Sequence, residues 1–416
     1  MKITHVEVTT LNNLFVNDRI RRAMQRANTH GERLHVYRVE TDNGLAGYGD
    51  SQDRRTDFSW MIGKSPVGLL TDPRLNVGLQ IALYDVVGKA EGVPVYQLLG
   101  PKVRDWCPIA WWAIDMSPEE WAEEAKHAVG LGYASFKLKA RPWWDIVEQV
   151  EAITQVVPSH FKLDVDFNSF LLNAGNAVPK LRQLDQYETV AIYESPIPQE
   201  DIEGYKHLRD RIAHPISLHF GSPPIMTTLR EEVCDGFVIG GTAGMIAQQA
   251  GIAAAANKSF WLQMVGGGLM TAFTVHLGAV HTHARWPAIT CHELWDDLLV
   301  ERLDVKDGYI RVPEAPGLGV QVDDAAIERY RIDPEAPSPK EEYLRQRHVL
   351  RIRWKGTNGR PGRSWAFLTE TDYQRSFYAG NMPLFVPGVR LEVIEDDKSA
   401  AFNHLYERVQ QGIVRE

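Results

Sequence analysis

Two lysines and two carboxylates stand at the ends of three short apolar runs that follow one another along the chain. Lys137 and Lys139 end the first run, Asp166 ends the second and Glu194 ends the third. Two carboxylates can hold a hard divalent cation such as Mg²⁺, which prefers oxygen ligands. A lysine beside such a cation and screened from water loses its proton more readily, because both effects disfavour the ammonium form. These residue types could therefore abstract a proton α to a carboxylate while the metal stabilises the enediolate.

Segments with helical periodicity separate these runs. Apolar residues recur at helical spacing between 144 and 157, and again from Val178 to Leu184. Alternating strands and helices are typical of parallel β/α units, whose functional groups collect at the carboxyl ends of the strands. We therefore expect the two lysines and the two carboxylates to meet in one pocket.

Strand-like runs continue at intervals as far as about Pro287. They are found at Cys107–Ala110, Ser135–Leu138, Phe161–Val165, Ala191–Tyr193, Pro215–Leu218, Gly236–Ile239 and Phe260–Gln263. None of them has the pattern of an edge strand, which favours a closed barrel over an open sheet. We therefore predict an α/β fold built around a barrel of the TIM type.

The order of elements divides the chain into four parts. The first contains alternating strands and an amphipathic helix, and the last differs from the rest in composition and is rich in strand patterns. The parts are residues 1–103, an α+β domain; residues 104–300, the barrel; residues 301–336, a return segment to the first domain; and residues 337–416, an appended β-rich C-terminal module.

A polar stretch from Asn12 to Glu32 lies between the first two predicted strands and carries several arginines. Two interpretations remain open. The stretch is either a solvated loop or a flexible lid whose arginines meet an anionic substrate, since long loops in compact domains are often functional. A pair of tryptophans, Trp143 and Trp144, follows the two lysines closely, and we favour a place for them in the wall of the pocket.

Composition excludes several classes of protein. The net charge of −9 argues against a nucleic-acid partner, because phosphate binding needs a basic surface. The 3 cysteines are far apart and predict neither a disulfide framework nor a metal site. The sequence begins directly with an alternating strand, and no apolar run has the length that a membrane span needs. We expect a cytoplasmic protein that binds no membrane.

Several motifs, taken in order, resemble those of the enolase superfamily, and in particular its mandelate racemase and muconate lactonizing enzyme group, of which the chain would be a divergent member. Each motif alone is weak, but their common order is a strong signal. The motifs are Ile81–Ala90 with Gly92–Gly100, Lys137-Leu138-Lys139, Asp166-Phe167-Asn168, Glu194-Ser195-Pro196 and Val312–Val320.

The resemblance implies a (β/α)₇β TIM-like barrel with an α+β capping domain. It also implies proton abstraction from a small carboxylate substrate on Mg²⁺, and a homo-oligomer. In that pattern Lys139 is the base, and Lys137 lowers the pKa of Lys139 or neutralises charge on the substrate. The remaining assignments are metal ligands at Asp166 and Glu194, and contacts with the substrate at Asn168, Gln263 and Glu293.

The chain also departs from the family pattern. Phe220 stands where a third acidic metal ligand is expected. Its neighbour His219 is a possible ligand or pocket residue, but successive strand residues face opposite ways, so we expect His219 to point elsewhere unless a bulge re-aims it. Gly240 and Gln263 replace an Asp–His dyad on the opposite face. Two carboxylates would hold Mg²⁺ only weakly, and a base on one side suits elimination or cycloisomerisation better than two-base racemisation.

Two functions follow from these observations. The first is a Mg²⁺-assisted lyase or isomerase, of dehydratase, cycloisomerase or racemase-like type, acting on a small hydroxy acid or acid sugar. The alternative is a degenerate member of the superfamily without metal-dependent catalysis, which serves as a ligand-binding or assembly protein with the C-terminal module as its interaction surface. The lysine pair favours the enzyme, whereas Phe220, Gly240 and Gln263 favour the alternative.

Overall fold

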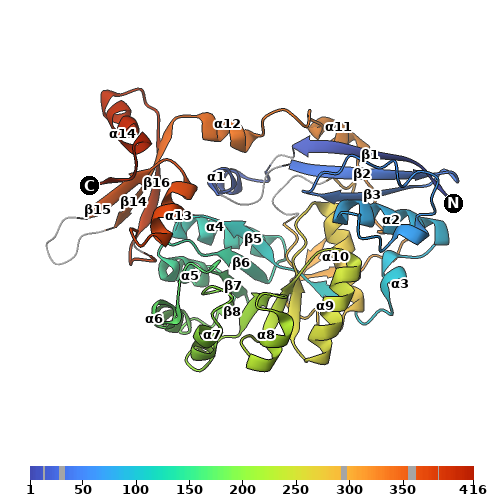
Figure 1. Cartoon of the computed structure of the whole chain (residues 1–416), viewed down its shortest axis with the longest axis horizontal. Helices are drawn as coiled ribbons and strands as arrows, with labels where there is room; N and C mark the ends of the chain where they lie inside the picture. Colours follow the sequence, from blue (N-terminus) through green and yellow to red (C-terminus); the bar gives the residue numbers. More distant parts are fainter. Residues whose placement is uncertain (13–14, 28–32, 292–297, 355–361, 383) are drawn as a thin grey trace.

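A computed structural model describes the chain except residues 13–14, 28–32, 292–297, 355–361 and 383. The described residues form an N-terminal α+β domain, a parallel barrel and a C-terminal module. Figure 1 shows the barrel between the other two parts, which lie toward opposite ends of the long axis of the molecule. Among the helices of this described part, none is long and apolar enough to cross a membrane.

The N-terminal domain packs one long helix against an antiparallel sheet. Its strands are β1 (Ile3–Asn12), β2 (Arg33–Thr41) and β3 (Ala46–Ser51), and the helix is α2 (Val77–Glu91). Asn76 caps the start of α2 by accepting a hydrogen bond from the backbone of Leu79. At Gly47 a Cβ would stand 2.1 Å from the carbonyl oxygen of Ala82, so only glycine lets the sheet approach the helix this closely.

The barrel strands are all parallel and pair in sequence order, β5 to β11. Their buried runs alternate with helices that cover the outside, as the periodicity predicts. The strands are β5 (Trp111–Ile114), β6 (Ser135–Lys139), β7 (Lys162–Asp166), β8 (Val190–Glu194), β9 (Ile216–His219), β10 (Gly236–Ile239) and β11 (Ser259–Leu262). The helices are α4 (Pro118–Gly130), α5 (Ile146–Thr154), α6 (Ala174–Leu184), α7 (Ile202–Arg209), α8 (Ile225–Glu231), α9 (Ala243–Ala255) and α10 (Gly268–Val280).

Residues 288 and 289 close the barrel. Ile289 pairs with Gln263 at the end of β11, and Ala288 pairs with Ile109 just before β5, both in parallel. The amide of Ala110 donates to the carbonyl oxygen of Ala288 at 3.0 Å. This short eighth segment completes a (β/α)₇β barrel, so the fold class predicted from the sequence is confirmed.

The first barrel strand was predicted too early in the chain, and only the end of the predicted run, Ile109 and Ala110, takes part in the barrel. The sequence predicts it at Cys107–Ala110, but β4 (Trp106–Pro108) pairs antiparallel with β13 (Tyr309–Arg311), outside the barrel. The barrel strand β5 begins at Trp111 instead. Both runs are short and apolar, and only tertiary pairing distinguishes them.

The return segment ties the first domain to the barrel. It contains β12 (Val305–Lys306), β13 and α11 (Asp324–Tyr330). Between them the backbone amide of Leu318 donates to Asp85 Oδ1 on α2 at 2.9 Å, and the carbonyl oxygen of Leu318 lies 3.1 Å from His276 Nε2 on α10. The neighbouring helix α3 (Val95–Leu99) joins the same seam, because the amide of Tyr96 donates to His276 Nδ1.

The C-terminal module is a small sheet with helices beside it. Its strand order is β16-β14-β15-β17, all antiparallel. The strands are β14 (His348–Trp354), β15 (Arg363–Phe367), β16 (Arg390–Glu395) and β17 (Val414–Arg415), and the helices are α12 (Pro339–Arg345), α13 (Glu370–Tyr378) and α14 (Ala400–Gln410). In Figure 1 α13 lies on the barrel side of the module, next to α4 and α5.

Candidate active site

Two lysines and two carboxylates meet at the carboxyl ends of three neighbouring strands. In the parallel register Lys139 on β6 is level with Asp166 on β7, which is level with Glu194 on β8. Lys139 forms an ion pair with Asp166. Lys137 Nζ lies 2.5 Å from Glu194 Oε2 and 3.4 Å from Asp166 Oδ2. The side chains of Lys137, Asp166 and Glu194 are fully buried, so these charges interact with little screening by water.

The two lysines differ in how burial and charge shift their pKa values. Burial alone would lower the pKa of Lys137, but the carboxylates of Glu194 and Asp166 outweigh burial and raise it. For Lys139 burial prevails over the attraction of Asp166, with help from the charges of Lys137 and Arg141, and its pKa is lowered. Lys139 is therefore the amine that gives up its proton more easily, as a general base must.

Asp164 joins this cluster and was missed in the sequence. It lies two residues before Asp166 on β7, level with Lys137, and is buried. Burial raises the pKa of its carboxyl to about 7, against the opposing charge of Lys137. Its Oδ2 has no hydrogen-bond partner among the residues that the structure describes. The alternation of Asp164 and Asp166 was a signal for a second inward carboxyl, because residues two apart on a strand face the same way.

The predicted orientation of His219 is wrong. His219 Nε2 lies 3.2 Å from Glu194 Oε1, and the imidazole therefore faces the cluster. Phe220 instead packs edge-on against Phe237, with ring centroids 5.3 Å apart. The strand β9 ends at His219. The residue that faces the cluster is therefore His219, one position before Phe220, where the family motif placed the third ligand.

Of the three remaining predicted contacts, the structure describes two. Gln263 Oε1 accepts a hydrogen bond from Lys137 Nζ at 2.7 Å, so Gln263 holds a lysine of the cluster. Asn168 follows Asp166, and its backbone amide donates to Asp166 Oδ1 at 2.9 Å. Glu293 lies outside the described residues.

Arg141 is a second group that the sequence analysis missed. It lies two residues beyond Lys139 and is only 4% exposed. Its Nη1 donates to Asn168 Oδ1 at 3.1 Å and to the carbonyl oxygen of Ala140. Its Nε lies 3.7 Å from Glu370 Oε1, a residue of the C-terminal module. Its place two residues after Lys139 was the available signal for a third cation near the strand end, but its buried partners Asn168 and Glu370 come from distant parts of the chain.

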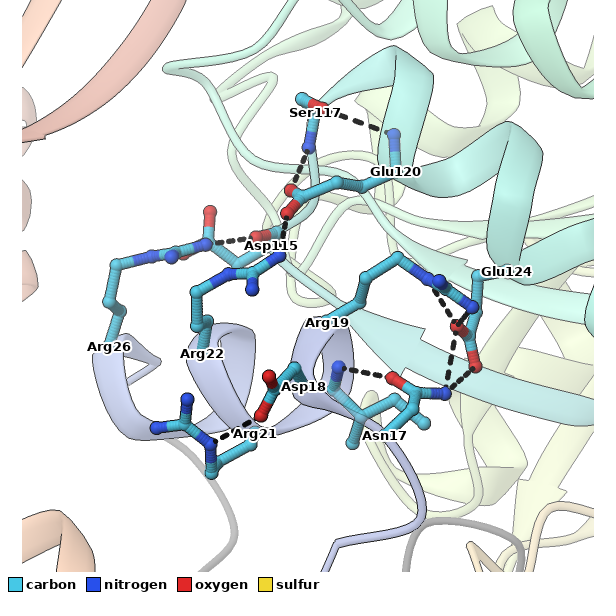
Figure 2. Close-up of polar contacts among 11 residues, drawn as sticks. Asn17, Asp18, Arg19, Arg21, Arg22, Arg26, Asp115, Ser117, Glu120 and Glu124 are labelled. Carbon is cyan, nitrogen blue, oxygen red and sulfur yellow. Dashed lines mark hydrogen bonds and ion pairs between the residues drawn. The ribbon is translucent and has the colours of Figure 1, made fainter.

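The described part of the arginine-rich stretch after β1 is a helix and not a solvated loop, and the lid remains a prediction. Residues Asp18–Arg26 form helix α1, capped by Asn17. Figure 2 shows three of its arginines directed at carboxylates of the barrel, whereas Arg21 pairs with Asp18 within the helix. Arg19 binds the buried Glu124, Arg22 binds Glu120, and Arg26 binds Asp115. These three arginines are therefore already neutralised by the protein itself.

Asp115 links α1 to the loop that follows Lys139. The carboxylate of Asp115 accepts hydrogen bonds from Trp143 Nε1 at 2.6 Å and Trp144 Nε1 at 2.8 Å, while Arg26 binds its other oxygen. Both tryptophans are buried. They belong to the hydrophobic core beside the strand end, and their hydrogen bonds to Asp115 hold the loop in place. Their place in a pocket wall stays a prediction.

The barrel region matches a family model. Residues 120–326 match the model described as "Enolase C-terminal domain-like". This region contains the lysine pair, both carboxylates and the strands that carry them. The chain belongs to the enolase superfamily. The resemblance found in the motifs, to its mandelate racemase and muconate lactonizing enzyme group, is thereby confirmed.

Curated relatives within this superfamily include enzymes with different reactions. An N-succinyl-L-Arg/Lys racemase of Bacillus cereus is 25% identical over 71% of this chain and 90% of its own. A muconate cycloisomerase of Acinetobacter lwoffii is 28% identical over 61% of this chain and 69% of its own. A D-gluconate dehydratase of Thermoproteus tenax is 25% identical over 67% of this chain and 59% of its own. Taken together, relatives of these kinds place the chain among enzymes of the isomerase and lyase type.

Solved structures of the superfamily share the fold. The N-succinyl Arg/Lys racemase of Bacillus cereus superimposes with a TM-score of 0.68 at 21% identity, covering 80% of this chain and 99% of its own. A mandelate racemase/muconate lactonizing family protein of Azoarcus sp. EbN1 gives 0.64 at 25% identity, covering 81% and 99%. About a fifth of this chain therefore has no counterpart in these structures. The C-terminal module makes up about the same share of the chain.

Superfamily members generally use Mg²⁺, but the residues of this site do not suit that ion as they are arranged. Two ammonium groups already balance Asp166 and Glu194, and the third side chain that faces them is the imidazole of His219. Mg²⁺ prefers oxygen ligands, and a divalent ion would add charge to a cluster with little access to water. Among the described residues no group of three or more His, Cys, Asp or Glu could hold a metal ion.

Proposed function

We propose that the protein abstracts the proton α to the carboxylate of a small hydroxy acid, acid sugar or acylated amino acid, with Lys139 as the base. One observation carries this proposal. Lys139 is a nearly buried amine with a lowered pKa, at the carboxyl end of a barrel strand, and it lies against a buried carboxylate and a second lysine. That arrangement supplies a base and a fixed positive charge side by side.

The residues divide the work as follows. Lys139 in its neutral form takes the proton from the α-carbon and becomes an ammonium. Asp166, whose pKa is held low by Lys139 and Lys137 in spite of burial, stays ionised and stabilises that ammonium. Lys137 stays protonated, because its raised pKa keeps it charged, and offers positive charge to the enediolate.

The opposite face of the barrel offers no second base among the residues predicted there. Gly240 has no side chain, and Gln263 is bound to Lys137. A single base can remove a proton and return it, to the leaving group or to the same carbon face. This favours elimination or cycloisomerisation over inversion of a stereocentre.

The test is solvent-deuterium incorporation in D₂O. Candidate acids are N-succinyl-L-lysine, D-gluconate, D-galactonate and muconolactone, the classes that the names of the relatives and of a solved muconate lactonizing enzyme complex indicate. Mass spectrometry and proton NMR would follow exchange at the α-carbon. We expect the wild type to exchange at least one acid, Lys139→Ala to lose that exchange by about a thousandfold or more, and Lys126→Ala, an exposed pair with Glu123, to behave as the wild type.

A second function follows from the charge balance of the cluster. Because the lysines and carboxylates satisfy one another without a metal, the barrel could bind an acid without turning it over. In that case no acid would exchange, yet one of them would raise the melting temperature of the wild type and not of Lys139→Ala. Calorimetric titration with Mg²⁺, with and without each acid, decides separately whether the ion binds.

A further inference from the structure

The C-terminal module lies against the two loops that leave the catalytic strand ends. One loop follows Lys139 and comprises residues 140–145. The other follows Asp166 and comprises residues 167–171. We call them the lysine loop and the aspartate loop. The module contacts both through α13 and the segment before β16.

Aromatic rings make the larger part of this contact. Tyr373 packs edge-on against Trp143 of the lysine loop, with ring centroids 4.9 Å apart. Phe377 packs against Phe170 of the aspartate loop at 5.5 Å. Phe385 packs against Phe167 of the same loop at 5.6 Å. Edge-to-face packing of buried rings fixes their relative orientation and excludes water.

Backbone hydrogen bonds join the same surfaces. The amide of Phe385 donates to the carbonyl oxygen of Pro142 at 3.1 Å. The amide of Gly388 donates to Asp145 Oδ2 at 2.9 Å, while Oδ1 of the same side chain caps the start of α5. The module is therefore bonded to the lysine loop at two points, and one of them is the residue that caps the helix following the loop.

Glu370 makes the one ion pair that reaches toward the cluster from the described part of the module. It is 6% exposed and lies beside Arg141. Arg141 in turn holds Asn168, which is bonded to Asp166. A continuous row of contacts thus runs from the module through Arg141 and Asn168 to a residue of the cluster.

The opposite side of the lysine loop is held by α1. Arg26 binds Asp115, and Asp115 accepts from both Trp143 and Trp144. Trp143 is therefore fixed on one side by α1, which we call the N-terminal arm, through Asp115, and on the other side by Tyr373. Two segments that are far apart in sequence therefore contact the same loop, and the loop cannot move without breaking contacts to both.

We propose that the C-terminal module is part of the wall of the active site, and that Glu370 is a positioning residue that sets Arg141 and Asn168 at the rim where the substrate binds. The role in substrate binding rests on the proposed function. The contact between the module and the two loops does not depend on it. Arg141 is buried, is paired with Glu370 and donates to Asn168, so the module fixes the position of its guanidinium and of Asn168 beside the strand ends.

The experiment uses the full-length protein in four forms: wild type, Glu370→Ala, Glu370→Asp and the control Glu392→Ala. Glu392 pairs with Arg353 within the module sheet, so its loss leaves the contact with the barrel unchanged. Hydrogen exchange followed by mass spectrometry would compare the lysine and aspartate loops with residues 236–239, a barrel strand away from the module. Deuterium incorporation into the acid that the wild type exchanges would give kcat and KM.

We expect Glu370→Ala to speed exchange in both loops by about threefold or more, with residues 236–239 unchanged. We also expect it to lower kcat/KM by about tenfold, mostly through KM. Glu370→Asp should recover part of both effects, and Glu392→Ala should match the wild type. A purely structural role would lower the melting temperature without moving KM.

Two results would overturn the proposal. One is exchange in both loops of Glu370→Ala that equals that of Glu392→Ala. The other is an unchanged KM in a variant whose loops exchange faster. If the wild type exchanges no acid at all, the proposed function fails, and the hydrogen-exchange comparison still decides whether the module positions the two loops.

Discussion

The protein buries charge in two regions that are built differently. At the seam between the N-terminal domain and the barrel, each oxygen of Asp85 accepts a hydrogen bond: Oδ1 from the amide of Leu318, and Oδ2 from the amide of Tyr48 and from Lys89 Nζ. In the cluster at the strand ends, Asp164 Oδ2 and Ser217 Oγ have no hydrogen-bond partner among the described residues. The seam is satisfied, and the cluster is not.

The difference indicates what each region contributes. A buried polar group with all its bonds made fixes one arrangement of the elements that it joins. A buried carboxyl without a hydrogen-bond partner lowers the stability of the fold, and proteins keep such groups where function requires them. We infer that the seam sets how the two domains dock, whereas the cluster keeps buried polar groups without partners at the expense of stability. The following predictions test that contrast.

Replacing Asp164 by Asn should stabilise the protein at pH 8. The folded pKa of about 7 lies above the ordinary value of 3.8, so this carboxyl favours folding below pH 4 and that contribution is lost as the pH rises through 7. By linkage the loss in the wild type is about 4 kcal/mol at most. Urea unfolding at pH 5 and pH 8 would measure it. A variant that is less stable than the wild type at pH 8 would contradict the prediction.

Replacing Asp85 by Asn should have the opposite effect and destabilise the protein by about 3 kcal/mol, because the new amide cannot accept from both backbone amides and Lys89. Chemical unfolding measures the change. Asp57→Asn, on an exposed turn bonded to Ser59, is the control. An Asp85→Asn variant as stable as this control would show that the hydrogen bonds of Asp85 do not stabilise the seam, which would contradict the contrast with the cluster.

Lowering the pH should weaken the seam at His276. Burial lowers the pKa of His276 to about 4 from 6.5, so the unfolded chain takes up a proton first and stability falls as the pH drops from 6.5 to 4. The expected loss is about 3 kcal/mol. Comparing the pH dependence of unfolding in wild type and His276→Gln would isolate it. Parallel curves for the two proteins would show that His276 does not carry the effect.

The arginines of α1 give the smallest effects and a graded comparison. Arg19→Ala leaves the fully buried Glu124 with Asn17 as its partner and should cost about 2 kcal/mol. Arg21→Ala breaks an exposed pair with Asp18 and should change stability by less than about 0.5 kcal/mol. Thermal unfolding of both variants would test the order. Equal effects would mean that burial of the carboxylate does not matter at this contact.

The sequence allowed the strands that carry the cluster to be predicted because their patterns are local. A period of two along a strand sets which residues face the barrel axis. Lys137 and Lys139 therefore share one face of β6, and Asp164 and Asp166 share the same face of the neighbouring strand β7. The order of strands and helices then requires parallel pairing, which brings these faces together at one end. The same local signal failed at β9, where a shift of one residue in the expected strand end exchanged His219 for Phe220.

The contacts around the cluster depend on segments that no local pattern connects. Arg141 is paired with Glu370, which lies 229 positions later in the chain, and Arg26 of α1 is paired with Asp115 across the boundary between the first domain and the barrel. Such pairings are decided by which surfaces fit when the whole chain is packed, since burial of a charge is favourable only where its partner is already in place. The sequence by itself determined a barrel with lysines and carboxylates at its strand ends. The tertiary structure alone decided that the N-terminal arm and the C-terminal module enclose the loop beside them.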